Sequence, residues 1–217
     1  MAQIATSIQQ DVHFFRGTSY GHTSTMKGAV TTMDMTTSFV GGDGGSWEVT
    51  SMQAITGPQL PTVKAIDVIH ASVPDVPSAA KWVLRGVASY ERYVNRAEHN
   101  QLVARQEGLG RPEATEVVLI PITKSAEWWS LMQDERREIL EERSHHIEIG
   151  LDYLPAIARQ LYHSRELGEP FDFLTWFEFA PKDVGQFDDL LAQLRASQEW
   201  TFIEREVEIR LTRAAAH

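Results

Sequence analysis

Short segments in which apolar and polar residues alternate recur along this chain of 217 residues, and they are typical of β-strands. In the first half, the pattern covers residues 46–55 (SWEVTSMQAI) and 81–94 (KWVLRGVASYERYV). In the second half, it covers residues 171–179 (FDFLTWFEF) and 205–212 (REVEIRLT). Residues 115–123 (TEVVLIPIT) are almost purely apolar, which predicts a buried strand.

Three segments have the spacing of helices instead. Residues 96–110 predict a short helix closed by glycine, and residues 183–197 predict an amphipathic helix. Residues 125–162 predict a longer helical segment that is interrupted near Gly150 and Pro155. Strands, helix and strand therefore follow in a similar order in each half. This order predicts an α+β fold of two ferredoxin-like units whose sheets combine, with the helices outside.

The beginning of the chain differs in composition from the rest. Residues 1–34 are rich in Thr, Ser, Gly and Met and show no clear period, which predicts an N-terminal extension that is flexible or binds a partner. The glycine cluster at residues 41–45 is typical of a loop, whereas residues 63–72 fit neither a strand nor a helix clearly. The repeated order of elements divides the remainder into an N-terminal half, residues 35–120, and a C-terminal half, residues 121–217.

Charge and cysteine content exclude several classes of function. Thirty acidic against twenty basic residues give a formal net charge of −10, and a chain this acidic repels the phosphate backbone of nucleic acids. Since there is no cysteine, disulfides, iron–sulfur clusters, zinc–thiolate sites and thiolate-ligated haem are excluded. Eight histidines and the carboxylates remain as ligands for a metal or cofactor.

The hydropathy pattern gives an expectation about location. No apolar stretch approaches the roughly 20 residues that a membrane helix needs. The first residues do not show a basic region followed by an apolar run, which a secretion signal would have. We therefore expect a cytoplasmic protein without a membrane or nucleic-acid partner.

His146 is the histidine whose position most suggests a ligand. On a continuous helix it would share a face with Trp128, Met132 and Ile139, whereas His145 would be turned toward the charged side. A neutral imidazole at the buried end of a helix is well suited to bind the iron of a haem. A histidine that is simply satisfied within the core is the alternative that spacing alone leaves open.

Several longer strings carry a family resemblance. They are EWW, DERREILEERSHHIEIGLDYLPAIAR, LYHSRELGEPFDFLTWFEFAP and EWTFIEREVEIR, preceded by WVLRG and RYVNRAE. Together they resemble the chlorite dismutases of the short, dimeric branch, over roughly residues 40–213. The resemblance implies a homodimer whose α/β barrel is built from two ferredoxin-like repeats, with a haem b site in the C-terminal half.

The resemblance also implies roles for individual residues. His146 matches the iron ligand, Arg159 matches the catalytic arginine on the opposite, distal side of the haem, and Glu199 matches the acid that accepts a hydrogen bond from the ligand imidazole. The other positions that match the haem pocket are Lys124, Trp128, Trp129, Leu161, Thr175 and Phe177.

The activity that the resemblance implies is the conversion of chlorite to chloride and O₂, which would serve detoxification. By this resemblance, ferric haem would accept an oxygen atom from chlorite, and the cationic Arg159 would hold the remaining anion until O₂ forms. The alternatives are a haem-binding or sensing protein without catalysis and an iron-coproporphyrin decarboxylase of the same superfamily. The decarboxylases lack an arginine at the position of Arg159, which argues against the second alternative.

The proposed site residues also have interpretations without function. Arg159 could be a surface arginine of a helix, the two tryptophans could fill the core, and Glu199 could end a helix. His22 and His163 are interpreted as structural or surface residues.

Overall fold

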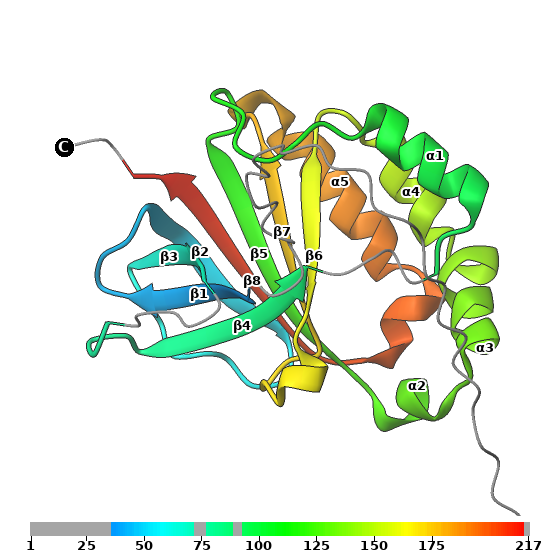
Figure 1. The fold of residues 1–217 in the computed structure, drawn as a ribbon, viewed down its shortest axis with the longest axis horizontal. Helices are drawn as coiled ribbons and strands as arrows, with labels where there is room; N and C mark the ends of the chain where they lie inside the picture. Colours follow the sequence, from blue (N-terminus) through cyan, green and yellow to red (C-terminus); the bar gives the residue numbers. More distant parts are fainter. Residues whose placement is uncertain (1–35, 72–76, 89–92, 215–217) are drawn as a thin grey trace, which may run out of the picture. The chain divides into compact units, whose positions relative to one another are not determined.

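Eight strands close into an antiparallel barrel in the computed structural model, which describes residues 36–71, 77–88 and 93–214. Their order around the barrel is β1-β3-β2-β8-β5-β7-β6-β4 (Figure 1). The strands are β1 (Thr36–Gly42), β2 (Trp47–Thr56), β3 (Ala65–His70), β4 (Trp82–Ala88), β5 (Glu116–Lys124), β6 (Ala158–His163), β7 (Phe173–Phe179) and β8 (Ile203–Arg213). The fold is thus of mixed α/β content, with the sheet closed on itself.

The two halves of the chain arrange their strands in the same order. β1 lies between β3 and β4, with β2 beyond β3, and β5 lies between β7 and β8, with β6 beyond β7. The connections differ, because helical segments join β5 to β6 and β7 to β8. By contrast, residues 43–46 join β1 to β2 without a helix. The link from β2 to β3, residues 57–64, corresponds to the link from β6 to β7, which contains only a short 3₁₀ turn.

The helical segments vary in length and type. They are α1 (Arg96–Arg105), α2 (Ala126–Ser130), α3 (Gln133–Arg137), a π-helix (Glu138–Arg143), α4 (His146–Asp152), α5 (Val184–Arg195) and three 3₁₀ turns (Arg165–Leu167, Pro181–Asp183 and Gln198–Phe202). Among the described helices, none combines the length and the hydropathy that crossing a membrane would require.

The two short helices predicted from the sequence are confirmed as α1 and α5, although Gln106 and not a glycine ends α1. The helical segment predicted over residues 125–162, with an interruption near Gly150 and Pro155, is confirmed only in part, as α2, α3, the π-helix and α4 up to Asp152. The chain leaves the helix several times, and residues 158–163 form strand β6. This segment pairs with β7 from Ala158 opposite Glu178 to His163 opposite Phe173, and the pairing outweighs any local preference for a helix.

The alternating segments predicted as strands contain β2, β4, β7 and β8, and the apolar run is confirmed as β5. Strand β4 ends at Ala88, and residues 93 and 94 of the same predicted strand belong to no strand. Residues 63–72, which were ambiguous, contain β3, whereas Gly41 and Gly42, expected in a loop, end β1. The division expected between residues 120 and 121 falls inside β5. The expected extension, residues 1–34, lies outside the described residues.

Strand β5 is buried on both faces, which accounts for its uninterrupted apolar sequence. Val117 and Leu119 belong to a hydrophobic cluster made largely of alternate residues from the other strands. Val118 and Ile120 point the opposite way and belong to a second cluster, to which α5 contributes Phe187 and other side chains. Figure 1 shows α1, α4 and α5 on the side of β5, β6 and β7 where this second cluster lies.

The loop between β1 and β2 crosses over β3. Gly42 at the end of β1 pairs with Ala65, and Trp47 at the start of β2 pairs with Ile66, so residues 43–46 carry the chain from one side of β3 to the other. A Cβ atom on Gly45 would lie 2.6 Å from the carbonyl carbon of Ile66. Because the obstructing atoms belong to the backbone of a paired strand, only glycine fits at this crossing.

We expect Gly45→Ala to destabilise the barrel by about 1–3 kcal/mol, the usual cost of forcing extra atoms into a packed site. Gly44→Ala is the matched control, since a Cβ there would meet nothing within 4 Å. Chemical denaturation of both variants measures the difference, and equal stability would show that the crossing is not tight.

Candidate functional site

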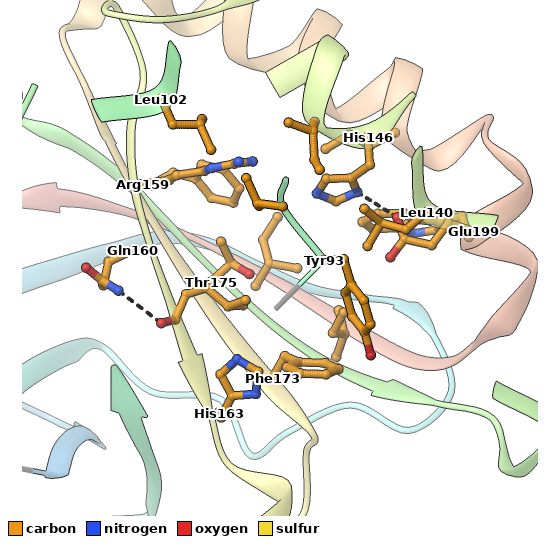
Figure 2. A pocket seen from close by; sticks show the side chains of 18 of the residues that line it. Tyr93, Leu102, Leu140, His146, Arg159, Gln160, His163, Phe173, Thr175 and Glu199 are labelled. Carbon is orange, nitrogen blue, oxygen red and sulfur yellow. Dashed lines mark hydrogen bonds and ion pairs between the residues drawn. The ribbon is translucent and has the colours of Figure 1, made fainter. Parts of the chain in front are cut away.

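A cavity of about 740 Å³ lies between the outer face of β5, β6 and β7 and the surrounding helical segments (Figure 2). Its volume is in the range of sites that enclose a cofactor or a small molecule. The barrel side contributes apolar side chains such as Ile120 and Phe177, and the helices contribute Leu102 from α1 and Leu194 from α5. A few polar and charged groups converge on this largely apolar space.

The structure brings together eight of the nine residues that the sequence pointed to. The cavity is lined by Lys124, Trp128, His146, Arg159, Leu161, Thr175, Phe177 and Glu199. Trp129 is not among the lining residues. Its indole N–H donates to Asp172 Oδ2 at 3.0 Å, its ring stacks on Phe173, and the Arg165 guanidinium lies over the ring.

The α1 side of the cavity was missed by the sequence interpretation. It comprises Tyr93, Asn95, Arg96, His99, Leu102 and Gln106. No local pattern marks these residues, because their place in the site depends on how α1 packs on distant segments. His163, interpreted as structural or surface, is buried and also lines the cavity. His22 lies outside the described residues.

His146 reaches the cavity by a different route from the one its spacing suggested. The chain breaks its helical path between α2 and α3 and again at His145, which has a left-handed backbone with φ of 52°. The prediction that Trp128 and His146 share one face of a continuous helix is therefore wrong, although both residues line the same cavity. His145 is exposed, as expected, and its Nδ1 lies 3.1 Å from Glu148 Oε2.

A buried carboxylate joins two of these residues. Glu199 is 4% exposed, and its Oε2 lies 2.6 Å from His146 Nδ1 while its Oε1 lies 2.7 Å from Lys124 Nζ. Its backbone N–H donates to Ser144 Oγ at 2.8 Å. A carboxylate that accepts from Nδ1 fixes the imidazole tautomer and leaves the Nε2 lone pair available to a metal. Figure 2 shows the imidazole directed into the cavity with Glu199 behind it.

The ionisation of Glu199 follows from these contacts. Burial by itself would raise the pKa of the carboxyl group, because it removes water from the charged form. Electrostatic attraction to His146 and Lys124 and the hydrogen bonds from both outweigh burial and hold the pKa of this carboxyl group well below its ordinary value. Glu199 therefore stays ionised and keeps both partners in place.

Arg159 enters the cavity from the barrel, as part of β6 and not of a helix. Its carbonyl accepts a hydrogen bond from Gln106 Nε2 at 3.0 Å. A Cβ atom on Gly150 would lie 2.9 Å from Arg159 Nη1, so the guanidinium packs against α4 one turn beyond His146. A permanent cation and an imidazole thus share one cavity, and Figure 2 shows both side chains pointing into it.

Trp128 has a buried donor without an acceptor in the described part of the chain. Its indole Nε1 makes no hydrogen bond, although the residue is only 1% exposed. Lys124 Nζ lies 4.4 Å above the ring. Since buried polar groups are nearly always satisfied, this N–H is suited to an acceptor on a molecule that fills the cavity.

We expect Glu199→Gln to destabilise the protein by about 3–5 kcal/mol at neutral pH, because it leaves Lys124 buried without its anion. A carboxyl whose pKa is lowered on folding contributes stability above its ordinary pKa, here 4.5, and loses it as the pH falls further. The difference in unfolding free energy between wild type and variant should therefore shrink below about pH 4.5. Urea unfolding across this range measures it, with the exposed Glu148→Gln as control. A difference that does not depend on pH would contradict this account.

Comparison with known proteins identifies the family to which the chain belongs. The family model "Chlorite dismutase" matches residues 61–214. A chlorite dismutase from Ideonella dechloratans is 38% identical over 76 residues, which cover 35% of this chain and 25% of that protein. The chain therefore aligns with about a quarter of the length of this curated relative.

Solved structures extend the similarity over most of the chain. The structure of dimeric chlorite dismutases from Nitrobacter winogradskyi is 54% identical, with a TM-score of 0.76, and the match covers 82% of this chain and 99% of that one. A mutant chlorite dismutase from Candidatus Nitrospira defluvii in complex with cyanide is 18% identical with a TM-score of 0.63, over 86% and 93% of the two chains, and shares the fold. By the extent of the family match and of the 54% identity, this chain belongs to the chlorite dismutase family.

Proposed function

We propose that this protein is a haem b enzyme that converts chlorite to chloride and O₂. Family membership supports the activity. The observation that carries the proposal is one cavity lined both by His146, whose Nδ1 is held by the buried Glu199, and by the cation Arg159. The first group is suited to bind an iron, and the second is suited to hold an anion beside it.

The residues of the cavity fit a haem. The lining is largely apolar, as a porphyrin requires, and His146 presents an imidazole whose Nε2 lone pair is available for the iron. The buried indole N–H of Trp128, which has no acceptor among the described residues, is suited to a propionate. Thr175, Phe177 and Leu161 would then face the substrate side. When bound, haem supplies a ferric iron that can take an oxygen atom from chlorite.

Arg159 would bind chlorite and retain the anion that remains after one oxygen atom has left. A guanidinium stays charged at any physiological pH and presents several N–H donors. In a cavity with few other charges, its attraction for an anion is far stronger than in bulk water. Chlorite contains all the atoms and the charge of chloride and O₂, so this chain needs no outside electron donor and no general base.

The finer architecture and the assembly are also proposals. The strand order shared by the two halves supports two ferredoxin-like repeats, of which the first lacks a helix between β1 and β2. The dimeric structure from Nitrobacter winogradskyi supports a homodimer. A cytoplasmic location, a role in detoxification and the absence of nucleic-acid and membrane partners stay predictions.

We expect His146→Ala to lose haem or to bind it weakly, because it removes the imidazole that Glu199 holds toward the cavity. His145→Ala is the matched control, since this neighbour is exposed and its Nδ1 pairs with Glu148 at the surface. Haem titration followed by the Soret absorption band measures both. Equal loss in the two variants, or loss only in His145→Ala, would refute His146 as the ligand.

We expect Arg159→Ala to keep its haem but to turn over chlorite on the order of tenfold more slowly, which corresponds to about 1.4 kcal/mol of transition-state stabilisation. The anion that remains when chlorite loses one oxygen atom is hypochlorite, an oxidant, and it should escape from the variant more often. The variant should therefore inactivate after fewer cycles, and added methionine, which consumes hypochlorite, should protect it more than wild type. Arg159→Lys should be intermediate, because it keeps the charge without the planar fork.

An oxygen electrode measures the rate and the total O₂ yield of these variants. Arg85→Ala is the control, since this arginine lies on β4 and pairs with Glu169 away from the cavity. A wild-type rate, yield and resistance to bleaching in Arg159→Ala would leave no role for the guanidinium. Haem binding without O₂ release by the wild type would instead indicate a non-catalytic haem protein.

A further inference from the structure

Helix α4 begins at His146 without an ordinary cap. The first N–H groups of a helix have no acceptor within it, and a short polar side chain at the residue before the helix usually supplies one. That residue is His145, whose side chain makes no such hydrogen bond and whose backbone is left-handed. The buried Ile147 follows, so its N–H cannot be satisfied by bulk water. Another acceptor is required.

Glu141, in the preceding π-helix, supplies it. Its Oε2 accepts a hydrogen bond from the N–H of Ile147 at 2.6 Å, and its Oε1 accepts one from the N–H of Glu148 at 3.3 Å. A carboxylate at this end of a helix is also favoured by the helix dipole.

The backbone of the same residue contacts the segment before His146. The carbonyl oxygen of Glu141 accepts from the N–H of His145 at 2.9 Å and from the N–H of Ser144. Four backbone donors, two on each side of His146, thus converge on one residue.

We propose that Glu141 is a positioning residue for the haem ligand, an inference that rests on the proposed role of His146. Glu199 fixes the rotation of the imidazole through Nδ1, and Glu141 fixes the backbone from which the side chain projects. The two constraints act at opposite ends of the His146 side chain. Because Nε2 is the ring nitrogen far from the backbone, even a small tilt of the backbone displaces it strongly. Glu141 therefore acts on the iron through His146 without contacting the cavity.

The test compares Glu141→Gln and Glu141→Asp with Glu142→Gln, which removes the same charge from an exposed neighbour. Gln keeps one acceptor oxygen but places an amide where a second acceptor is needed, whereas Asp keeps the carboxylate on a shorter side chain.

In the protein without haem, hydrogen exchange at the amides of Ile147 and Glu148 should be at least tenfold faster in Glu141→Gln. Glu141→Gln should bind haem about tenfold more weakly, because its imidazole ligand is held less firmly. In the haem-loaded variant the reduction potential of the iron should shift upward, because a less firmly held imidazole stabilises ferric iron less. Glu141→Asp should restore part of each effect, and Glu142→Gln should match wild type.

Two results would overturn the proposal. Unchanged amide exchange in Glu141→Gln would show that the carboxylate does not hold the helix. Faster exchange and a lower melting temperature, with haem affinity and potential as in wild type, would show that Glu141 stabilises α4 but does not position the ligand. Failure of the proposed function is distinct, because the wild-type protein would then bind no haem at all.

Discussion

The buried carboxylate of Glu199 is the interaction on which the rest of the site depends. A charge with almost no exposure to water is tolerable only when it is paired, and Glu199 is paired on both oxygens. Lys124 comes from the end of β5 and His146 from the start of α4, while Ser144 holds the backbone of Glu199 itself. The carboxylate of Glu199 therefore links helix α4 to strand β5 of the barrel, and it contacts α4 at His146, the residue proposed to bind iron.

The alternation of strand residues decides which side chains reach the cavity. Along β7, Leu174 and Trp176 belong to the cluster inside the barrel, whereas Thr175 and Phe177 line the cavity outside it. A shift of the register by one residue would exchange these two sets. Pairing with β5 and β6 on either side of β7 prevents such a shift, so the packed barrel core fixes the chemistry of the opposite face.

Strands β2, β4, β5, β7 and β8 could be predicted because one-sided burial or complete burial leaves a pattern in the sequence itself. β6 could not, because its residues alternate poorly and become a strand only through pairing with β7. The same limit applies to the site. His146 and Arg159 were found by family resemblance, and the helical phase offered for His146 was wrong because the chain breaks at His145. Lys124 and Glu199 meet across 75 positions of sequence, and no local pattern records such a contact.

His146 and Arg159 are close in sequence, but His146 belongs to helix α4 and Arg159 to strand β6. A loop from the other half of the chain, residues 106–111, contacts the turn that joins these two elements and so helps to fix their relative positions. Arg111 donates to the carbonyl oxygens of Pro155 at 3.3 Å and Ala156 at 2.8 Å, within the turn that leads from α4 to β6. Gln106, in the same loop, holds the carbonyl of Arg159. The turn, which belongs to no helix or strand, is therefore held by these side chains in addition to its own backbone hydrogen bonds. An anion site needs its cation placed against the cofactor before the substrate arrives, since reorganisation during the reaction would weaken the stabilisation that the charge can give. By this reasoning the loop at residues 106–111 supports the proposed function as much as α4 does, although it contributes neither the proposed iron ligand His146 nor the proposed anion-binding Arg159.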